Sequence, residues 1–332
     1  MDNIHSIAYR RRLLPPRRHP TATLLPALDC AFETTPKECA QVRRILAKAA
    51  QFPPEIVDIV MDLAEYWACS VTSVDYSNTA NGELDVLGSS GPNRNENKFV
   101  LRTEPLGLTA WQSSNDTRAL WLKQAPPRKL VEEYSRKEFE NFIDGPLLGL
   151  AHPFRKVVFD IVSRDQGWGG GGASRNSFRS SWTWFDAGID RFDKGHTCST
   201  ECVEGHEDRA SNASEKAPSV CAVRPVWPSL DESLSNYSHE LLPTAKHRIQ
   251  CNRVAVTEWQ RHHVEWSWTD NIDAESSAGE ELDENGRGAG TGDGSFVRNL
   301  KVGDMITVWA RARFPGWVNK VKEVHVRVYW AV

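Results

Sequence analysis

The sequence lacks any long uncharged apolar run, and its first twenty residues lack an apolar core of signal-peptide length. A membrane-spanning helix and a secretory signal are therefore not expected. Lysine and arginine total 40 against 44 aspartates and glutamates, a formal net charge of -4. That balance lacks the basic excess of nucleic-acid-binding proteins. The cysteines number seven and are scattered, which favours reduced thiols, so we expect a cytoplasmic or nuclear protein.

Signatures of common enzyme classes are also missing. The chain has no G-x-S-x-G, no H-E-x-x-H and no protein-kinase motif. The glycine run 169–172 is not followed by the Lys-Ser/Thr pair of a phosphate-binding loop. His262 and His263 are adjacent on an expected strand, so their side chains point to opposite faces. We therefore expect a non-enzymatic protein that needs no cofactor.

The amino-terminal third divides into a tail, a helical hairpin and a linker. Residues 1–35 are rich in proline and arginine without periodicity, and we expect a disordered tail. Apolar residues recur at helical spacing in 37–50 and again in 54–67, which predicts a hairpin within 36–69. Two prolines, Pro53 and Pro54, separate the helices. Residues 70–96 are rich in Ser, Asn and Gly, which indicates a linker.

From residue 97 to residue 332 the pattern is that of β-structure. Short apolar runs alternate with polar residues and are bounded by Gly, Pro and Asn. The run 157–162 is apolar on both faces, which is typical of a central strand. One small helix is expected after Ser135, which forms a capping box with Glu138. The fold class is therefore mainly β: an antiparallel β-sandwich of jelly-roll or galactose-binding-like type, preceded by the short helical hairpin.

Two polar segments interrupt this β-region. Residues 194–245 and 270–295 contain few large apolar side chains, and the second carries a nearly unopposed run of carboxylates. Such segments have little apolar surface to bury. We expect both to be loops inserted between strands of one domain.

Several strings resemble an uncharacterised family of filamentous-fungal proteins. The resemblance covers most of residues 36–332 and is strongest at the end of the chain, in 296–332, which contains VWARARFPGW. The strings RDQGW at 164–168 and SWTWF at 181–185 match the same family. The resemblance implies a fold and no established activity, and the galactose-binding-like comparison is an analogy of fold alone.

The string FPPEI at 52–56 resembles the first helix of an F-box. This resemblance implies a protein partner, the ubiquitin-ligase subunit that binds F-boxes. The residues that would meet a partner lie along the second helix: Ile56, Ile59, Leu63 and Trp67. An F-box continues into further helices, and residues 70–96 do not show a helical pattern.

Two groups of residues are candidates for ligand binding. In the loop before the glycine run, Trp168 would stack on a flat ring while Asp165 and Gln166 make directional hydrogen bonds. A flexible hairpin without a ligand is the alternative. Along the strand 306–314, Trp309, Arg311 and Arg313 face one way, with Trp317 in the next turn. That face suits a glycan or an anionic group, or else it pairs with carboxylates such as Asp160 or Glu265.

A possible metal site lies in the first polar segment. His196, Cys198, Cys202 and His206 fall within eleven positions, which is enough for a tetrahedral zinc site. The usual Cys-x2-Cys spacing is absent, so the sequence does not favour a bound metal.

The combined evidence predicts a ligand- or protein-binding module. Its partner would be a small ligand, either a glycan or an anionic group, or another protein. Two alternatives remain open: an F-box-like adaptor of a ubiquitin ligase, and a carbohydrate-active enzyme on a jelly roll. The last would need two carboxylates about 5 to 10 Å apart in a cleft.

Overall fold

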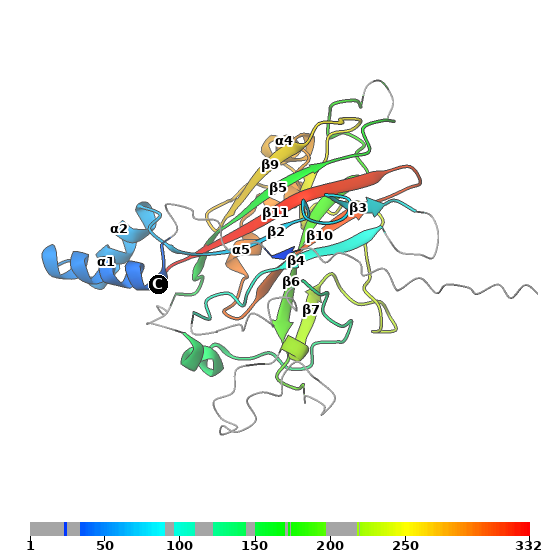
Figure 1. Cartoon of the computed structure of the whole chain (residues 1–332). Coiled ribbons are helices and arrows are strands. Elements are labelled where there is room, and N and C mark those ends of the chain that lie inside the picture. The colour runs from blue at the N-terminus through cyan, green and yellow to red at the C-terminus, as the bar shows by residue number, and fades with distance from the viewer. Residues whose placement is uncertain are drawn as a thin grey trace, which may run out of the picture.

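The architecture comes from a computed structural model of the whole chain. It describes residues 23–24, 34–89, 96–109, 122–143, 150–169, 172, 174–196, 218 and 220–332. Of these, 23–24 are described by their backbone alone. Within these ranges the chain is mainly β, with two antiparallel sheets and two helices near its start (Figure 1).

The first sheet contains six strands, in the order β1-β2-β11-β5-β9, with β3 also paired to β11. β3 pairs with the first residues of β11 and β2 with the rest, so both lie along the same side of that long strand. The bounds are β1 (Thr23–Leu24), β2 (Ala68–Asp75), β3 (Leu84–Leu87), β5 (Phe154–Arg164), β9 (Gln260–Ser267) and β11 (Val318–Trp330).

The second sheet contains five strands, in the order β4-β10-β6-β7, with β8 also paired to β6. Its strands are β4 (Asn97–Arg102), β6 (Thr183–Phe192), β7 (Val223–Trp227), β8 (Arg248–Cys251) and β10 (Met305–Ala312). Two 3-10 turns flank these strands, η1 (Arg136–Phe142) and η3 (Val220–Ala222). The capping box expected before the first of them is present, because the Glu138 carboxylate accepts hydrogen bonds from the backbone and hydroxyl of Ser135.

The main core lies between the two sheets. One face of β10, formed by Ile306, Val308, Ala310 and Ala312, is fully buried against apolar residues of β11 and β5. β5 pairs with β11 on one side and with β9 on the other, so the expected central strand is confirmed. Alternation of apolar and polar residues puts one side of each strand in this core.

The two expected helices are confirmed as α1 (Pro36–Ala49) and α2 (Pro54–Leu63). They form a hairpin at one end of the sandwich, and it projects from the body of the molecule (Figure 1). Cys39, Val57 and Met61 belong to the main core cluster. At the joint, Arg155 of β5 donates two hydrogen bonds, of 2.9 and 3.0 Å, to the carboxylate of Asp62. The hairpin is thus packed against the sandwich and does not merely connect to it through the chain.

The structure differs from the linker expected at 70–96. Residues 68–75 form β2, which runs antiparallel to the end of β11, and residues 84–87 form β3. Val74 and Val86 are buried, while the serines and threonines that suggested a linker occupy much of the rest of β2. Pairing with β11 supplies the backbone hydrogen bonds, so this segment needs few apolar side chains of its own.

The acidic segment 270–295 is also more ordered than its composition predicts. It contains α4 (Ser277–Glu284) and the turn η4 (Ala289–Thr291), and α5 (Ser295–Arg298) follows. Contacts with distant strands hold it in place: Asp283 pairs with Arg248, and the Arg287 guanidinium donates to the carbonyl of His263 at 2.8 Å. These polar contacts supplement the small apolar contact that Ile272 and Leu282 make around Gly292.

The later part of the other polar segment covers the outer face of the second sheet. Tyr237 is buried there and donates a hydrogen bond to the carbonyl of Ala125 at 2.8 Å. A second apolar cluster lies under the same cover and includes Phe139, Phe192 and Met305. In the ranges that the structure covers, no helix is long and apolar enough to cross a bilayer.

Candidate binding sites

The loops at the end of the sandwich away from the helical hairpin are joined into one surface. The turn between β10 and β11 contacts the loop after β5, because the Val318 amide donates to Gln166 Oε1 at 3.1 Å. It also contacts the segment before β6, where Phe314 packs edge-on against Trp182 with ring centroids 4.7 Å apart. The Gly88 amide donates to the carbonyl of Trp317 at 2.8 Å, which adds the end of β3.

The polar side chains proposed to bind a ligand in this region are engaged with the backbone. Asp165 is 1% exposed, and its carboxylate accepts from the amides of Gly167, Ala255 and Val256. Burial raises the pKa of Asp165, while these three amide donors oppose the shift. The Gln166 side chain donates to the carbonyl of Trp168 at 2.6 Å. Asp165 and Gln166 therefore shape the loop.

Trp168 itself is presented to solvent, with 63% of its surface exposed. Its ring lies beside Gly316, where an added Cβ would approach the indole to 3.4 Å. Other apolar side chains at this end are exposed as well, and because they are far apart in sequence no local pattern identifies them as a group. We call the set Leu87, Trp168, Leu241, Leu242 and Phe314 the tip surface.

The arginine face of β10 is buried by the chain itself. Trp309, Arg311 and Arg313 point to one side as expected, and each is at most 2% exposed. The Nε atom of Arg311 lies 2.7 Å from Asp186 Oδ2 on β6, so its carboxylate partner is neither Asp160 nor Glu265.

Arg313 anchors the covering segment at the same face. Its guanidinium donates to the carbonyls of Glu240 and Leu241 and lies 5.0 Å from the centroid of the Trp184 ring. Burial lowers the pKa of Arg313 to about 10, and the nearby Arg311 adds to that effect. In this conformation both arginines bind their own chain, and Trp317 is half-buried at the edge of the tip surface.

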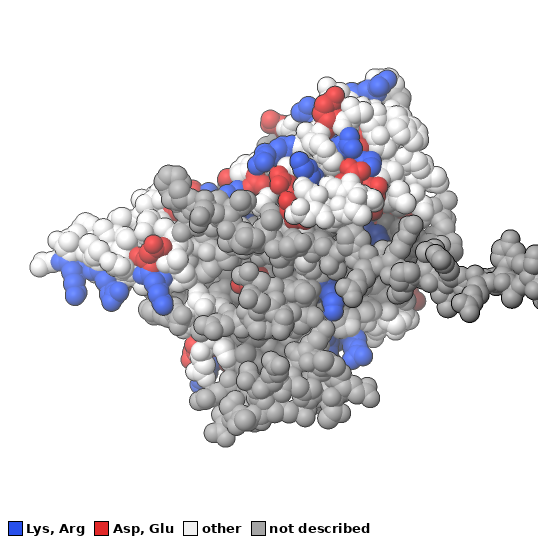
Figure 2. Space-filling model, viewed as in Figure 1, with Lys and Arg blue, Asp and Glu red and all other residues white. Residues whose placement is uncertain are grey.

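Unlike the arginine face of β10, the outer side of the helical hairpin is exposed to solvent. Ile56, Ile59 and Leu63 follow one stripe of α2 and are 41%, 53% and 81% exposed. We call these three residues the α2 stripe. Phe52 and Ile45 are exposed nearby on the same hairpin. Lysine and arginine side chains gather along one edge of the hairpin (Figure 2).

Trp67 does not belong to the α2 stripe. It lies beyond the end of α2, is 6% exposed and donates from its indole Nε1 to Asp62 Oδ1 at 2.9 Å. The Lys156 ammonium lies 5.7 Å from its ring centroid. Trp67 therefore helps to fix the hairpin, whereas the other three predicted partner-binding residues are accessible.

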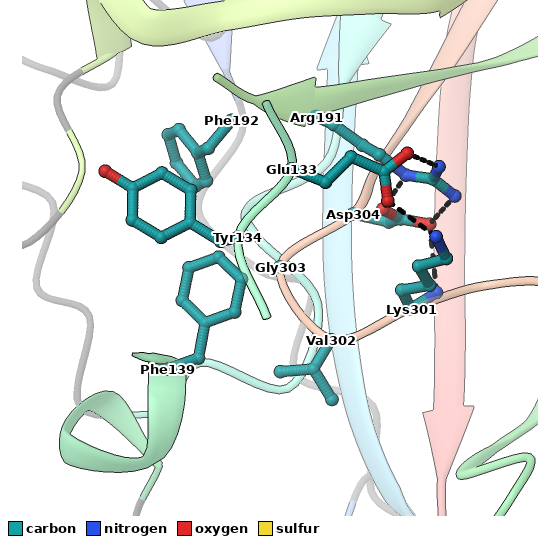
Figure 3. A pocket seen from close by; sticks show the side chains of 9 residues that line it. All are labelled: Glu133, Tyr134, Phe139, Arg191, Phe192, Lys301, Val302, Gly303 and Asp304. Atoms are coloured by element: carbon teal, nitrogen blue, oxygen red, sulfur yellow. Dashed lines mark hydrogen bonds and ion pairs between the residues drawn. The ribbon is translucent and has the colours of Figure 1, made fainter. Parts of the chain in front are cut away.

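A shallow pocket of about 230 Å³, including its open mouth, lies beside the second apolar cluster. Its two walls differ in chemistry (Figure 3). Tyr134, Phe139 and Phe192 line one wall, and the other carries a cluster of charged groups.

The charges of this pocket neutralise one another. Arg191 binds Asp304 through two hydrogen bonds, of 2.7 and 3.1 Å, and reaches Glu133 at 2.8 Å. Lys301 pairs with Glu133 at 2.6 Å. The hydrogen bond from Lys301 lowers the pKa of Glu133, and burial raises the pKa of Asp304. Because both carboxylates are held by cations, the cluster acts as a clamp between β6 and the loop before β10.

The predicted zinc ligands are only partly within the described chain. Cys198, Cys202 and His206 lie outside the described residues. His196 is described, and its Nδ1 lies 2.9 Å from the guanidinium of Arg224. Among the residues with assigned positions, no group of three or more His, Cys, Asp or Glu is arranged to hold a metal ion.

Comparison of the chain with protein-family models, curated proteins and solved structures finds no match.

Proposed function

We propose that this protein is a non-enzymatic binding module that presents the α2 stripe to a protein partner. The observation that carries the proposal is the exposure of Ile56, Ile59 and Leu63 on a helix whose other side is buried in the core. Their i, i+3, i+7 spacing is the pattern by which helices bind apolar grooves. An exposed apolar stripe on a helix is also costly to keep in water unless something covers it.

The anchoring of the hairpin supports this role. The Arg43 guanidinium pairs with Asp58 and donates to the carbonyl of Val332 at 3.0 Å. With the pair between Arg155 and Asp62, this fixes both helices before any partner arrives. A preorganised helix loses little conformational entropy on binding, which favours affinity.

The exposed charges on the neighbouring helix α1 suggest the character of the partner. Lys37, Arg44 and Lys48 are exposed on α1, at spacings that place them along one side of that helix. We therefore propose a partner with an apolar groove and an acidic rim. Charge complementarity of this kind raises the rate of association and selects among partners.

A photo-crosslinking amino acid placed at Ile59 of the full chain tests the proposal in cells. The matched control carries the same amino acid at Val131, which is 77% exposed elsewhere on the molecule. We expect an adduct specific to position 59 that disappears in the Leu63→Asp background. Identical adducts at both positions, or none at position 59, would count against a partner at this surface.

An F-box-like adaptor is a second candidate, favoured by the exposed α2 stripe that follows FPPEI. In this chain β2 begins at Ala68, directly after the hairpin, where an F-box continues into further helices. Binding of the purified ubiquitin-ligase subunit that recognises F-boxes would support the adaptor role if Ile56→Asp abolished it. No binding to the wild-type chain would exclude that role and leave the more general proposal standing.

A further inference from the structure

The tip surface is an apolar patch assembled from parts of the chain that are far apart in sequence. Its five side chains are exposed as follows: Leu87 by 50%, Trp168 by 63%, Leu241 by 63%, Leu242 by 53% and Phe314 by 40%. Trp182 and Trp317 are half-buried among them. Such a combination is costly in water, which indicates that this end of the sandwich meets an apolar phase or partner.

Asp165 and Gln166, the two polar side chains predicted to bind a ligand here, are unavailable to a sugar. Sugar recognition needs side chains that form directional hydrogen bonds beside an aromatic ring. At the tip both carboxylate oxygens of Asp165 accept backbone amides. Both polar atoms of the Gln166 amide are also engaged, one with Val318 and the other with Trp168. The remaining exposed set is aliphatic as well as aromatic, which suits a lipid interface better than a glycan.

Backbone contacts hold the described parts of the loops at the tip. The turn that carries Asn176 is joined to the segment after β8, since the Asn176 amide donates to the carbonyl of Val254 at 2.8 Å. Phe314 has a φ of +65°, in the left-handed region that non-glycine residues seldom adopt. Such conformations persist only where neighbouring contacts impose them. The tip is therefore a preformed surface.

Three exposed arginines lie together on one side of this end of the sandwich. Arg175, Arg179 and Arg253 are exposed in the two joined loops, and Arg253 lies 5.3 Å from the centroid of the Phe178 ring. Within the described chain, Glu240 and Glu258 are also exposed at this end. On β3, Asp85 pairs with Lys320 at 3.1 Å, and the same ammonium pairs with Glu83, which also meets Arg164.

We propose that the tip surface inserts into the interface of an anionic lipid bilayer, with the three arginines against the headgroups. Tryptophan and leucine favour the boundary between headgroups and acyl chains, and basic residues strengthen binding to anionic lipids. The helical hairpin lies at the other end of the molecule (Figure 1), so a bilayer at the tip would leave the α2 stripe accessible. The inference is independent of the proposed protein partner.

Sedimentation of the full chain with vesicles tests the inference. One set contains phosphatidylcholine alone, and the other contains about 30% phosphatidylserine. The tip variant is Trp168→Ser/Leu242→Ser, and the matched control is Ile59→Ser/Leu63→Ser at the other end, which removes two side chains of similar exposure. Thermal melts check that both variants remain folded.

We expect the wild type to sediment with the anionic vesicles and the tip variant to partition at least about tenfold less, since each buried apolar side chain is worth roughly that factor. The hairpin variant should bind as the wild type does. Replacing Arg175, Arg179 and Arg253 by Gln should weaken binding to the anionic vesicles by roughly fivefold for each arginine. It should leave any binding to phosphatidylcholine unchanged.

Three results would overturn the inference. The first is no sedimentation of the wild-type chain at millimolar lipid. The second is equal binding by the tip variant, and the third is loss of binding in the hairpin variant alone. If the chain did not bind vesicles but bound a soluble protein through Trp168, the same surface would instead be assigned to a protein partner.

Discussion

The Nε atom of Arg311 lies 2.7 Å from Oδ2 of Asp186 on the neighbouring strand, and neither residue is more than 2% exposed. Burial raises the pKa of Asp186, and the charge of Arg311 opposes that shift. A charge in such a place is stable only while its partner remains. The pair therefore links two strands on the outer face of the second sheet and is not available to a ligand in solvent.

Removing one member of this pair should destabilise the fold strongly. Arg311→Met leaves the Asp186 carboxylate buried without its cation and should cost about 3–5 kcal/mol of unfolding free energy. The double variant Arg311→Met/Asp186→Leu should cost less than either single change, because no isolated charge remains. Urea unfolding followed by tryptophan fluorescence measures all three.

The control for this prediction is Arg261→Met. Arg261 pairs with Glu323 at 3.4 Å, but its side chain is 69% exposed. Its loss should change stability by less than about 1 kcal/mol. Additive losses in the double variant at Arg311 and Asp186 would show that the two side chains do not act as a pair.

Alternation of residue types predicted β10 and its two faces correctly, but not what covers the outer one. The periodicity of Trp309, Arg311 and Arg313 is local, whereas the segment that buries them includes Glu240 and Leu241, some seventy residues away. Local pattern determines which way a side chain points, while exposure depends on distant parts of the chain. The same limit applies to the tip surface, where only the loop containing Trp168 and the turn containing Trp317 were predicted as sites.

The two helices could be predicted because their periodicity is a local sequence pattern, whereas β2 could not. Apolar residues of α2 recur at helical spacing, and its prolines mark the start. Residues 68–75 have little alternation and depend on pairing with β11. The acidic segment was misjudged because composition does not reveal contacts such as that between Asp283 and Arg248.

The joint between the hairpin and the sandwich should depend on Asp62. Asp62→Ala removes the carboxylate partner of Arg155, a side chain only 3% exposed, and an acceptor for the Trp67 indole. We expect a loss of about 2–4 kcal/mol from the docking of the hairpin. Hydrogen exchange should become faster in α1 and α2 and change little in β5.

Glu65→Ala provides the matched control for this joint. Glu65 pairs with Lys156 at 2.6 Å, but its side chain is 59% exposed. This variant should leave exchange in the hairpin almost unchanged, because exposed ion pairs contribute less than about 1 kcal/mol. Equal acceleration in both variants would mean that the buried geometry at Arg155 has no special role.

Two adjacent histidines on β9 should change the pH dependence of folding stability in opposite directions. Burial, with smaller contributions from the charges of Arg253 and Arg287, lowers the pKa of His262 to about 4. Between about pH 6.5 and pH 4 the unfolded chain then binds more protons at this position than the folded chain does. The free energy of unfolding should therefore decrease as the pH is lowered through this window, by at most about 3 kcal/mol. The variant His262→Gln should show a smaller decrease.

His263 provides the contrast. A hydrogen bond to Asp160 raises its pKa, with a further contribution from Glu265. Its stabilisation is present below its unfolded pKa and disappears as pH rises through the higher folded value. His263→Gln should therefore lower stability at pH 5 and leave it unchanged at pH 8, though only slightly, because the side chain is 53% exposed. Unfolding curves at the two pH values that gave the same sign for both variants would contradict this assignment.

Replacing a residue of left-handed backbone at the tip by glycine should stabilise the fold. Ala255 has a φ of +57° in the segment that donates its amide to Asp165. Glycine adopts this conformation without steric cost, so Ala255→Gly should raise stability by about 1 kcal/mol and the melting temperature by roughly 2 °C. Ala274→Gly is the control, since Ala274 is a half-buried residue without a positive φ and its change to glycine should destabilise. A fall in melting temperature for both variants would show that neighbouring contacts accommodate Ala255 without strain.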